Sequence, residues 1–333
     1  MSVVYGLITG LAFGFVLQRG RVCFNSAFRD LRLMKDNFMF KAGMLAVAVS
    51  TIAFLAMAQF GLIHLNPKPL NYVGVILGGY LFGIGMTFAG GCASGTTYRI
   101  TEGNTTSWLA GLFYGLFAIA SRSGFLSPVV QFVNQWTIKT PSNSALFLGE
   151  ETGPNLASIF NVSPWIAGLV FAGLIFAYLF ATKTTERTTA NWGWIKTGLL
   201  IVPVAMFGFW TNTLSGGNYG LGITGGWMNI LGAVQQGAAL NWAGAEVLGI
   251  MIGAGITAAA YKEFKLRVPK KGKTYLLVSI GGALMGLGAV MAGGCNIGHF
   301  LTGIPQLALS SILAGVFFIL GNWTMTRITF GKM

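Results

Sequence analysis

The sequence predicts an all-α integral membrane protein of about nine transmembrane helices, with short re-entrant helices and an inverted internal repeat with pseudo-two-fold symmetry. Hydrophobic residues make up 54% of the 333 positions and charged residues only 9%, a balance that a soluble domain of this size could not keep in solution. The 49 glycines lie mostly inside apolar segments, which is typical of closely packed or interrupted membrane helices. A glycine-rich motif ending in cysteine also occurs twice.

Nine segments are apolar and long enough to cross a bilayer, whose hydrocarbon core of about 30 Å needs roughly 20 helical residues. We expect these spans at residues 2–18, 38–62, 70–90, 107–133, 163–182, 191–210, 242–261, 274–292 and 305–328. The fourth carries Arg122 in its second half, so a short span followed by an interfacial segment is expected there. The apolar start lacks a basic leader, which favours a retained first span over a cleaved signal.

The distribution of positive charge predicts the orientation of the chain. Nine crossings place the odd-numbered loops and the C-terminus on one side, and these segments hold all but three of the 21 Lys and Arg residues. The exceptions are Lys68, Arg122 and Lys139. By the positive-inside rule we expect a multi-pass protein of the cell inner membrane, with its N-terminus outside and its C-terminus in the cytoplasm. Because orientation explains the charges, the net charge of +13 does not indicate nucleic-acid binding.

The repeat becomes visible when the chain is aligned with itself at an offset of 203 residues. GGYLFGIGMTFAGGCASG (78–95) then matches GGALMGLGAVMAGGCNIG (281–298) at ten of eighteen positions. The two copies close the third and the eighth span, so they enter the membrane from opposite sides. We therefore expect one transmembrane domain over 1–333, with a first half at 1–133, a connecting helix at 163–182 and an inverted second half at 191–330.

Each copy of the motif predicts a broken helix. Tandem glycines favour ending one helix and starting another after the cysteine, which exposes backbone N–H groups at a half-helix N-terminus. Such an end carries about +0.5 charge and attracts anions, so Gly91 and Gly294 are candidate supports for a bound anion. The alternative is that these glycines only allow helices to pack closely. Two further re-entrant segments are expected, one around Cys23 and one at Leu214–Trp227.

Three cysteines, Cys23, Cys92 and Cys295, are the main candidates for binding a substrate. Their odd number and long spacings argue against a disulfide framework or a zinc site, and we expect no metal, cofactor or catalytic residue. One interpretation is that they are buried, inert thiols. The other uses the thiol as a polarisable, weak hydrogen-bond donor, which suits a soft terminal sulfur better than a hydrated oxyanion. Cys23 follows the first span in a basic segment that we expect near the cytoplasm.

Polar residues close to the cysteines are weaker candidates for supporting an anion. They are Arg21, Asn25, Asn296 and His299. Orientation charge explains the arginine equally well, and a histidine near an interface is more often structural. Glu246 is a rare acid in an apolar run, where it could carry protons or lie in the headgroup region.

The motifs GGCASG, GGCNIGHFLTG and RGRVCFN together resemble the YeeE/YedE family of membrane proteins, and more narrowly its thiosulfate-uptake members. The resemblance extends over essentially the whole chain. It implies an hourglass-like, inverted-repeat helical protein in which thiosulfate passes between the thiols of Cys23, Cys92 and Cys295. It also implies a small cytoplasmic TusA-like sulfur-carrier protein as a partner.

The residues leave several functions open. The expected one is thiosulfate uptake, in which transient S–H···S hydrogen bonds relay the ion between buried thiols. The alternatives are transport of another sulfur or selenium anion, a membrane sulfur-transfer protein that forms a persulfide, and an anion channel with inert cysteines. A persulfide would require a resolving partner, and the sequence indicates no pair of neighbouring thiols. We expect no enzyme activity, because the sequence shows no cluster of acid, base and nucleophile.

Overall fold

The computed structural model describes residues 1–142, 144–185 and 192–331, and helices dominate this part of the chain. Within these ranges, eight helices are long and apolar enough to cross a membrane. They are α1 (Ser2–Gly20), α3 (Phe38–Gln59), α4 (Tyr72–Ala89), α9 (Pro164–Ala181), α10 (Trp194–Leu214), α12 (Trp242–Ala260), α13 (Lys273–Ala292) and α14 (Leu309–Phe330). A ninth span results if α6 (Thr105–Arg122) and α7 (Ser127–Asn134), which are bent by 66°, cross together. The predicted all-α membrane fold is confirmed.

The predicted spans agree with these helices to within a few residues. The predicted fourth span is the bent pair of α6 and α7, and the bend follows Arg122 directly. The predicted start of the sixth span, at residue 191, lies outside the described residues. Shorter elements connect the long helices. They are α2 (Phe24–Leu33), α5 (Ala93–Ile100), α8 (Leu156–Phe160), α11 (Thr224–Gln236), the π-helix η1 (Gly298–Gly303) and the 3-10 helix η2 (Ile304–Gln306). Two antiparallel pairs join β1 (Leu70–Asn71) to β2 (Thr137–Ile138) and β3 (Thr140–Pro141) to β4 (Glu151–Thr152).

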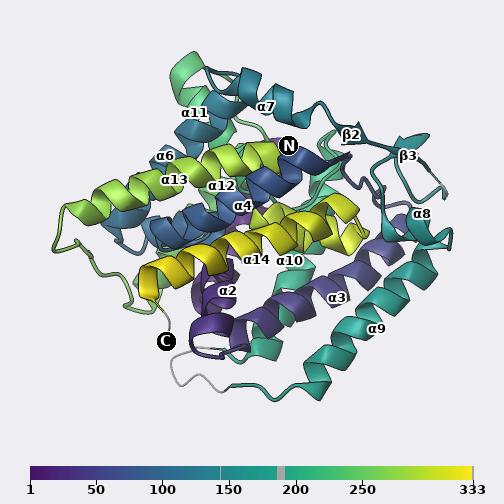
Figure 1. Ribbon diagram of the computed structural model, residues 1–333, viewed down its shortest axis with the longest axis horizontal. Helices are drawn as coiled ribbons and strands as arrows, with labels where there is room; N and C mark the ends of the chain where they lie inside the picture. Colours follow the sequence, from purple (N-terminus) through teal and green to yellow (C-terminus); the bar gives the residue numbers. More distant parts are fainter. Residues whose placement is uncertain (143, 186–191, 332–333) are drawn as a thin grey trace.

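The same order of helices occurs twice along the chain. A long helix, a short one, two long ones, a short one and a long one follow each other from α1 to α6 and again from α10 to α14. The packing partners also correspond, since α1 lies against α12 as α10 lies against α3, and α6 against α13 as α14 against α4. Figure 1 shows α13, α4 and α14 side by side. The division into two inverted halves stays a prediction, and a pseudo-two-fold axis between α4 and α13 would produce these pairings.

Glycines bring α4 and α13 into backbone contact. A Cβ atom at Gly78 would lie 2.6 Å from the carbonyl oxygen of Gly288, and a Cβ atom at Gly288 would lie 2.6 Å from that of Gly78. Gly85 and Gly281 make the same reciprocal contact at 2.8 Å. The repeat offset relates Gly78 to Gly281 and Gly85 to Gly288, so each contact corresponds to the other, as in an isologous interface. Small residues at both crossings let the two helices approach without intervening side chains.

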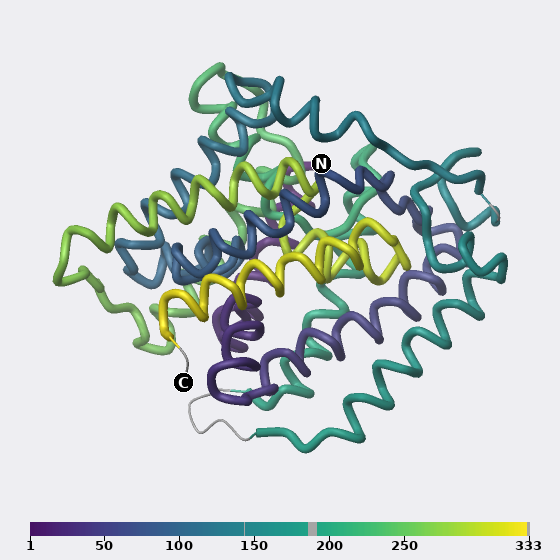
Figure 2. Tube along the Cα trace, viewed as in Figure 1, coloured from purple at the N-terminus to yellow at the C-terminus, as the bar shows by residue number. Residues whose placement is uncertain are grey.

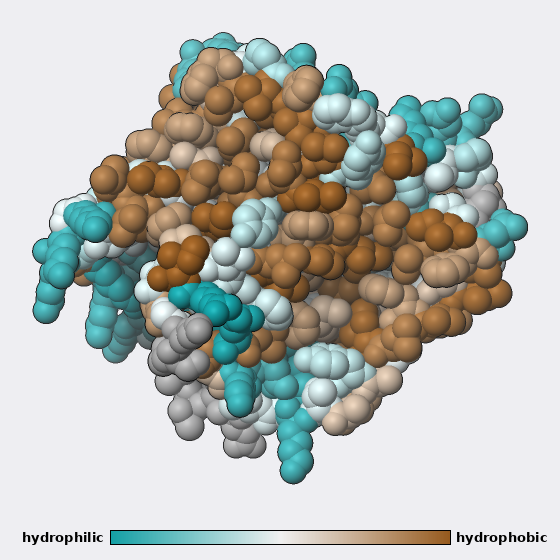
Figure 3. Space-filling model, in the orientation of Figure 1, coloured by the Kyte–Doolittle hydropathy of each residue, from teal (hydrophilic) through white to brown (hydrophobic). Residues whose placement is uncertain are grey.

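The exterior carries a broad hydrophobic band. Figure 3 shows this band between hydrophilic residues that gather at opposite edges of the molecule. Helix α9, which lies beside α3 at one edge of Figure 2, contributes Leu174 and Phe180, whose exposed fractions are 67% and 82%. Such a surface requires lipid, because a soluble monomer rarely exposes so large an apolar patch.

The α4–α13 contact leads to a stability prediction. We expect Gly78→Ala to lower the melting temperature of the purified protein, because the added Cβ would overlap the backbone of α13. Overpacking of this kind costs about 1–3 kcal/mol. Thermal unfolding in detergent, followed by tryptophan fluorescence, measures the effect. Gly173→Ala is the matched control, since no atom lies within 4 Å of the added Cβ. Equal melting temperatures for both variants would contradict the proposed close contact.

Candidate functional site

The first AGGC motif ends α4 and begins α5. Gly90 adopts a left-handed backbone with φ of 67°, and the N–H of Gly91 donates to the carbonyl of Met86 at 3.2 Å. Cys92 then caps α5, and its Sγ accepts a hydrogen bond from the N–H of Gly95 at 3.4 Å. The predicted restart of the helix after the cysteine is confirmed here. The backbone at Gly90 favours glycine because side chains strain this conformation.

The second motif repeats this arrangement at the end of α13. Gly293 has a φ of 84°, and the N–H of Gly294 donates to the carbonyl of Ala289 at 2.8 Å. Helical structure resumes after Cys295 and continues into η1, where the N–H of His299 donates to the carbonyl of Cys295 at 3.0 Å. In both motifs the N–H of the second glycine therefore closes the preceding helix. The role of these glycines in supporting an anion stays a prediction.

Cys23 lies beside Cys92, which the sequence did not indicate. A Cβ atom at Gly95 would lie 2.8 Å from Sγ of Cys23 and 3.4 Å from Sγ of Cys92, so both thiols face the same bare stretch of α5. Cys23 is the N-cap residue of α2 and is fully buried. The left-handed turn at Arg21, with φ of 52°, ends α1 just before it. The fold therefore supplies a pair of neighbouring thiols of which the sequence alone carries no sign.

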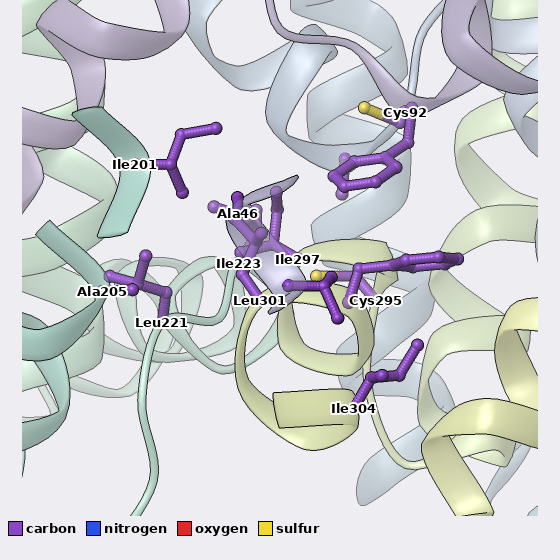
Figure 4. Packing of buried hydrophobic residues seen from close by; sticks show 14 of the residues in the cluster. Ala46, Cys92, Ile201, Ala205, Leu221, Ile223, Cys295, Ile297, Leu301 and Ile304 are labelled. Carbon is purple, nitrogen blue, oxygen red and sulfur yellow. The ribbon is translucent and has the colours of Figure 1, made fainter. Parts of the chain in front are cut away.

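All three cysteines are free thiols within one buried apolar cluster. Figure 4 shows Cys92 and Cys295 at two levels of this cluster, with Ile297 close to Cys295. Phe24, which follows the first cysteine, packs its ring 4.9 Å from that of Phe300 in η1. Apolar side chains from both predicted halves therefore surround the thiols.

A cavity of about 370 Å³ is lined by Cys295 and by charged residues from distant parts of the chain. Lys68 comes from the segment before β1, Arg122 from the end of α6, and Glu246 from α12. In the sequence, Lys68 is only an exception in the distribution of orientation charges, and Arg122 is such an exception and the mark of an interrupted fourth span. Their one detectable signal was their position on the side of the membrane predicted to carry few positive residues.

Lys68 brings a positive charge close to the third cysteine. Its Nζ donates to the carbonyl of Gly293 at 2.6 Å, at the negative end of the α13 dipole. The same atom lies 3.9 Å from the position of a Cβ at Gly294 and 4.2 Å from the centre of the Tyr219 ring. Partial burial lowers the pKa of Lys68 to about 8. The cavity therefore presents an ammonium group and a thiol within a short stretch of backbone.

Three predicted polar residues have different surroundings. Asn25 accepts a hydrogen bond from Nδ2 of Asn322 at 2.7 Å, and Nδ1 of His299 lies 2.9 Å from Oγ of Ser311. The amide of Asn296 is fully buried, yet neither its nitrogen nor its oxygen has a hydrogen-bond partner in the described part of the chain. A buried amide without partners is costly. Asn296 thus retains hydrogen-bonding capacity for a ligand beside Cys295.

Arg21, the remaining predicted residue, is engaged by two carboxylates. Its guanidinium lies 2.6 Å from Oε1 of Glu102 and 2.6 Å from Oε2 of Glu263. Arg19 contacts Glu263 at 3.0 Å, and Nε2 of Gln18 donates to both carboxylates. These five residues, which we call the ion-pair network, join the end of α1 to the segments after α5 and α12. The anion-binding role of Arg21 stays a prediction.

The ion-pair network leads to a prediction on pH and stability. Burial raises the pKa of Glu263, but the hydrogen bond from Gln18 and the charges of Arg21 and Arg19 outweigh it and hold this pKa below its usual value. A carboxyl with a lowered folded-state pKa stabilises the fold above its unfolded pKa, and this contribution is lost as pH falls through the folded value. We therefore expect Glu263→Gln to lower the melting temperature at pH 7.

The difference between wild type and Glu263→Gln should shrink as pH falls below about 4.3, the pKa of an unperturbed glutamate, and disappear below the lowered folded-state pKa, where the carboxyl is protonated in both states. Melting temperatures of both proteins in detergent, at pH 7 and at acidic pH, measure this difference. Glu151→Gln is the control, since its ion pair with Lys139 is exposed and contributes little. A difference that persists unchanged at low pH would rule out a charge effect.

Comparison with known proteins gives matches over nearly the full length of the chain. A family model described as sulphur transport matches residues 19–324. The thiosulfate transporter TsuA of Spirochaeta thermophila is 54% identical over 327 residues, covering 98% of this chain and 99% of the relative. The thiosulfate transporter TsuA of Escherichia coli is 33% identical over 338 residues, covering 98% and 95%. A probable transporter of Escherichia coli, YedE, is 38% identical over 108 residues, which cover 32% of this chain and 26% of the relative.

Proposed function

Since this chain belongs to the sulphur transport family, we propose that it takes up thiosulfate across the cell inner membrane. Both full-length relatives are named as thiosulfate transporters, and transport requires no catalytic group. The observation that carries the proposal is the cavity in which Lys68 lies next to Cys295. Thiosulfate combines a soft terminal sulfur with two negative charges. A thiol beside an ammonium group matches both features.

The proposed path relays the ion between the three thiols. Thiosulfate enters the cavity and meets the thiol of Cys295 through an S–H···S contact. The buried, unpaired amide of Asn296 does not line this cavity, so it would bind the oxygen atoms of the ion further along the path. Cys92 and Cys23 then receive it together, because both thiols face Gly95. Each contact is weak, and conduction requires sites that release the ion as readily as they bind it. The surrounding apolar cluster opposes leakage of hydrated ions.

The direction of transport follows from the proposed orientation, with the N-terminus outside and the C-terminus in the cytoplasm. Two of the three cations expected on the outer side, Lys68 and Arg122, line the cavity, so the cavity faces outward in this orientation. The ion-pair network then lies at the cytoplasmic end of α1. We further propose that a small cytoplasmic TusA-like sulfur-carrier protein accepts the sulfur, as the family resemblance implies.

The neighbouring thiols of Cys23 and Cys92 favour one alternative function, transfer of sulfur to the protein. One thiolate would attack the terminal sulfur of thiosulfate, forming a persulfide on the cysteine and releasing sulfite. The adjacent thiolate would then attack this persulfide, forming a Cys23–Cys92 disulfide and releasing hydrosulfide, and a cellular thiol would have to reduce the disulfide before the next cycle. This alternative predicts a mass increase of one sulfur atom on the protein and free sulfite, whereas the relay predicts neither.

Growth on thiosulfate tests the proposed function. In cells that lack their own sulfate and thiosulfate importers, we expect this protein to restore growth on thiosulfate as the sole sulfur source. Cys92→Ala should reduce growth at least tenfold, because it removes a thiol of the relay. Ser50→Ala is the matched control, since it also removes one polar atom from a buried side chain, on α3.

Equal growth of Cys92→Ala and Ser50→Ala, with equal amounts of both variants in the membrane, would show that the thiol of Cys92 serves only in packing. Growth on a different sulfur or selenium anion, with none on thiosulfate, would move the proposal to that cargo. Persulfide on the purified protein after thiosulfate treatment would instead favour sulfur transfer.

A further inference from the structure

Glu246 is a carboxyl group in a cavity that we expect to hold an anion. It lines the cavity with Cys295 and is fully buried. Its two oxygens accept a hydrogen bond only from the backbone N–H of Gly222, at 3.3 and 3.4 Å, and it makes no ion pair within the described ranges. A buried, ionised carboxylate without a cation is costly, and such residues in membrane proteins often carry function.

The groups that face Glu246 do not neutralise it by direct contact. Across the cavity lie Lys68, Arg122, Tyr219 and Cys295. Helix α1 packs along α12 through glycines, and its titratable side chains are those of Tyr5 near one end and Arg19 near the other, where Arg19 pairs with Glu263. Helix α11 carries no charged residue, and Lys196 of α10 lies at the opposite end of that helix. Helix α5 packs against the far end of α12, where Thr101 contacts Gly255. The charge state of Glu246 therefore depends on what occupies the cavity.

Thiosulfate and an ionised Glu246 would repel each other in this enclosed space. Like charges in a weakly solvated site disfavour ionisation of the carboxyl group. Protonation of Glu246 therefore strengthens binding of the anion, and by reciprocity the bound anion favours protonation of Glu246.

We propose that Glu246 is a proton-binding site, and that thiosulfate enters the cavity together with one proton. This inference rests on the proposed function and adds its coupling ion. The proton passes from hydronium in the external solution to a carboxylate oxygen of Glu246, leaving water, and no other bond changes. The dianion and the proton then occupy the cavity together. The proton cancels one of the two negative charges of thiosulfate, so inward movement costs less energy against the inside-negative membrane potential.

The proposal predicts the sign of the pH dependence. Raising the pH removes the proton from Glu246 and weakens thiosulfate binding, by at most about tenfold per pH unit for one coupled proton. Thiosulfate itself stays a dianion between about pH 5.5 and 8.5. Lys68, with its pKa of about 8, also loses its positive charge as the pH rises. The contributions of Glu246 and Lys68 to the pH dependence must therefore be measured separately. Lys68→Arg allows this, because an arginine keeps its charge at every pH used.

Uptake of radiolabelled thiosulfate by the full chain in proteoliposomes, between about pH 5.5 and 8.5, tests the proposal. A pH-sensitive dye inside the vesicles records proton entry. We expect thiosulfate uptake by wild type and by Lys68→Arg to fall as the pH rises toward 8, and proton entry to fall with it. Glu246→Gln mimics the protonated acid, so it should lose the proton signal and keep only the slope near pH 8 that the titration of Lys68 causes. Glu246→Gln combined with Lys68→Arg should be flat throughout, and Glu151→Gln on the exposed surface should match wild type.

Two results overturn the inference: uptake by Lys68→Arg that does not change with pH below 8, or a slope that Glu246→Gln combined with Lys68→Arg retains. A second measurement does not depend on a variant. Calorimetric titration of wild type with thiosulfate, in buffers of different ionisation heat, should show uptake of protons on binding, and zero uptake overturns the inference. Absence of thiosulfate uptake at every pH would instead overturn the proposed function, so the two failures are distinguishable.

Discussion

Where α4 crosses α13, the two backbones touch without side chains between them. Gly78 meets Gly288 and Gly85 meets Gly281, and larger residues at any of these positions would push the helices apart. Both helices then end in the same Gly-Gly-Cys turn, so the crossing also fixes where Cys92 and Cys295 lie relative to each other. The rest of the site depends on this contact, because the short helices that hold the cysteines begin where these two long helices end. Close packing of small residues supplies this precision in a solvent that offers no hydrophobic driving force between helices.

The two predicted halves carry the same order of helices but different chemistry at one corresponding position. Cys23 precedes α2 as its N-terminal cap, and Ile223 precedes α11 in the same way. One end of the site therefore holds two thiols beside each other, whereas the other holds the single thiol of Cys295, next to Lys68 and an isoleucine. This difference explains an odd number of cysteines in a repeated fold. Under the proposed relay it would also give the two ends different tasks, since a charged cavity attracts an ion from water and a thiol pair surrounded by apolar groups would hold it only through weak contacts.

The sequence predicted those features that depend on local pattern. Apolar segments of sufficient length located the spans, Arg122 located the bend after α6, and the tandem glycines located both helix breaks. It could not predict features that arise from tertiary contact. Arg21 and its two carboxylate partners lie in segments that only the fold brings together, and a positive residue beside a span has the same appearance whether it orients the chain or forms an ion pair. The proximity of Cys23 and Cys92 also arises from a tertiary contact. The second half of the repeat contains no equivalent pair that could have indicated it.

Gly95 has a consequence for how precisely the thiol pair can be tuned. Both sulfur atoms face the main chain at a residue that has no side chain, and each belongs to a cysteine that caps a helix. The position of each sulfur relative to this backbone therefore depends on a helix end and on a single χ1 rotation. A site lined by long side chains changes shape whenever one of them turns, and it admits a range of ions. Two short side chains against a bare backbone change shape much less, so such a site would discriminate between ligands by atomic radius more than by charge.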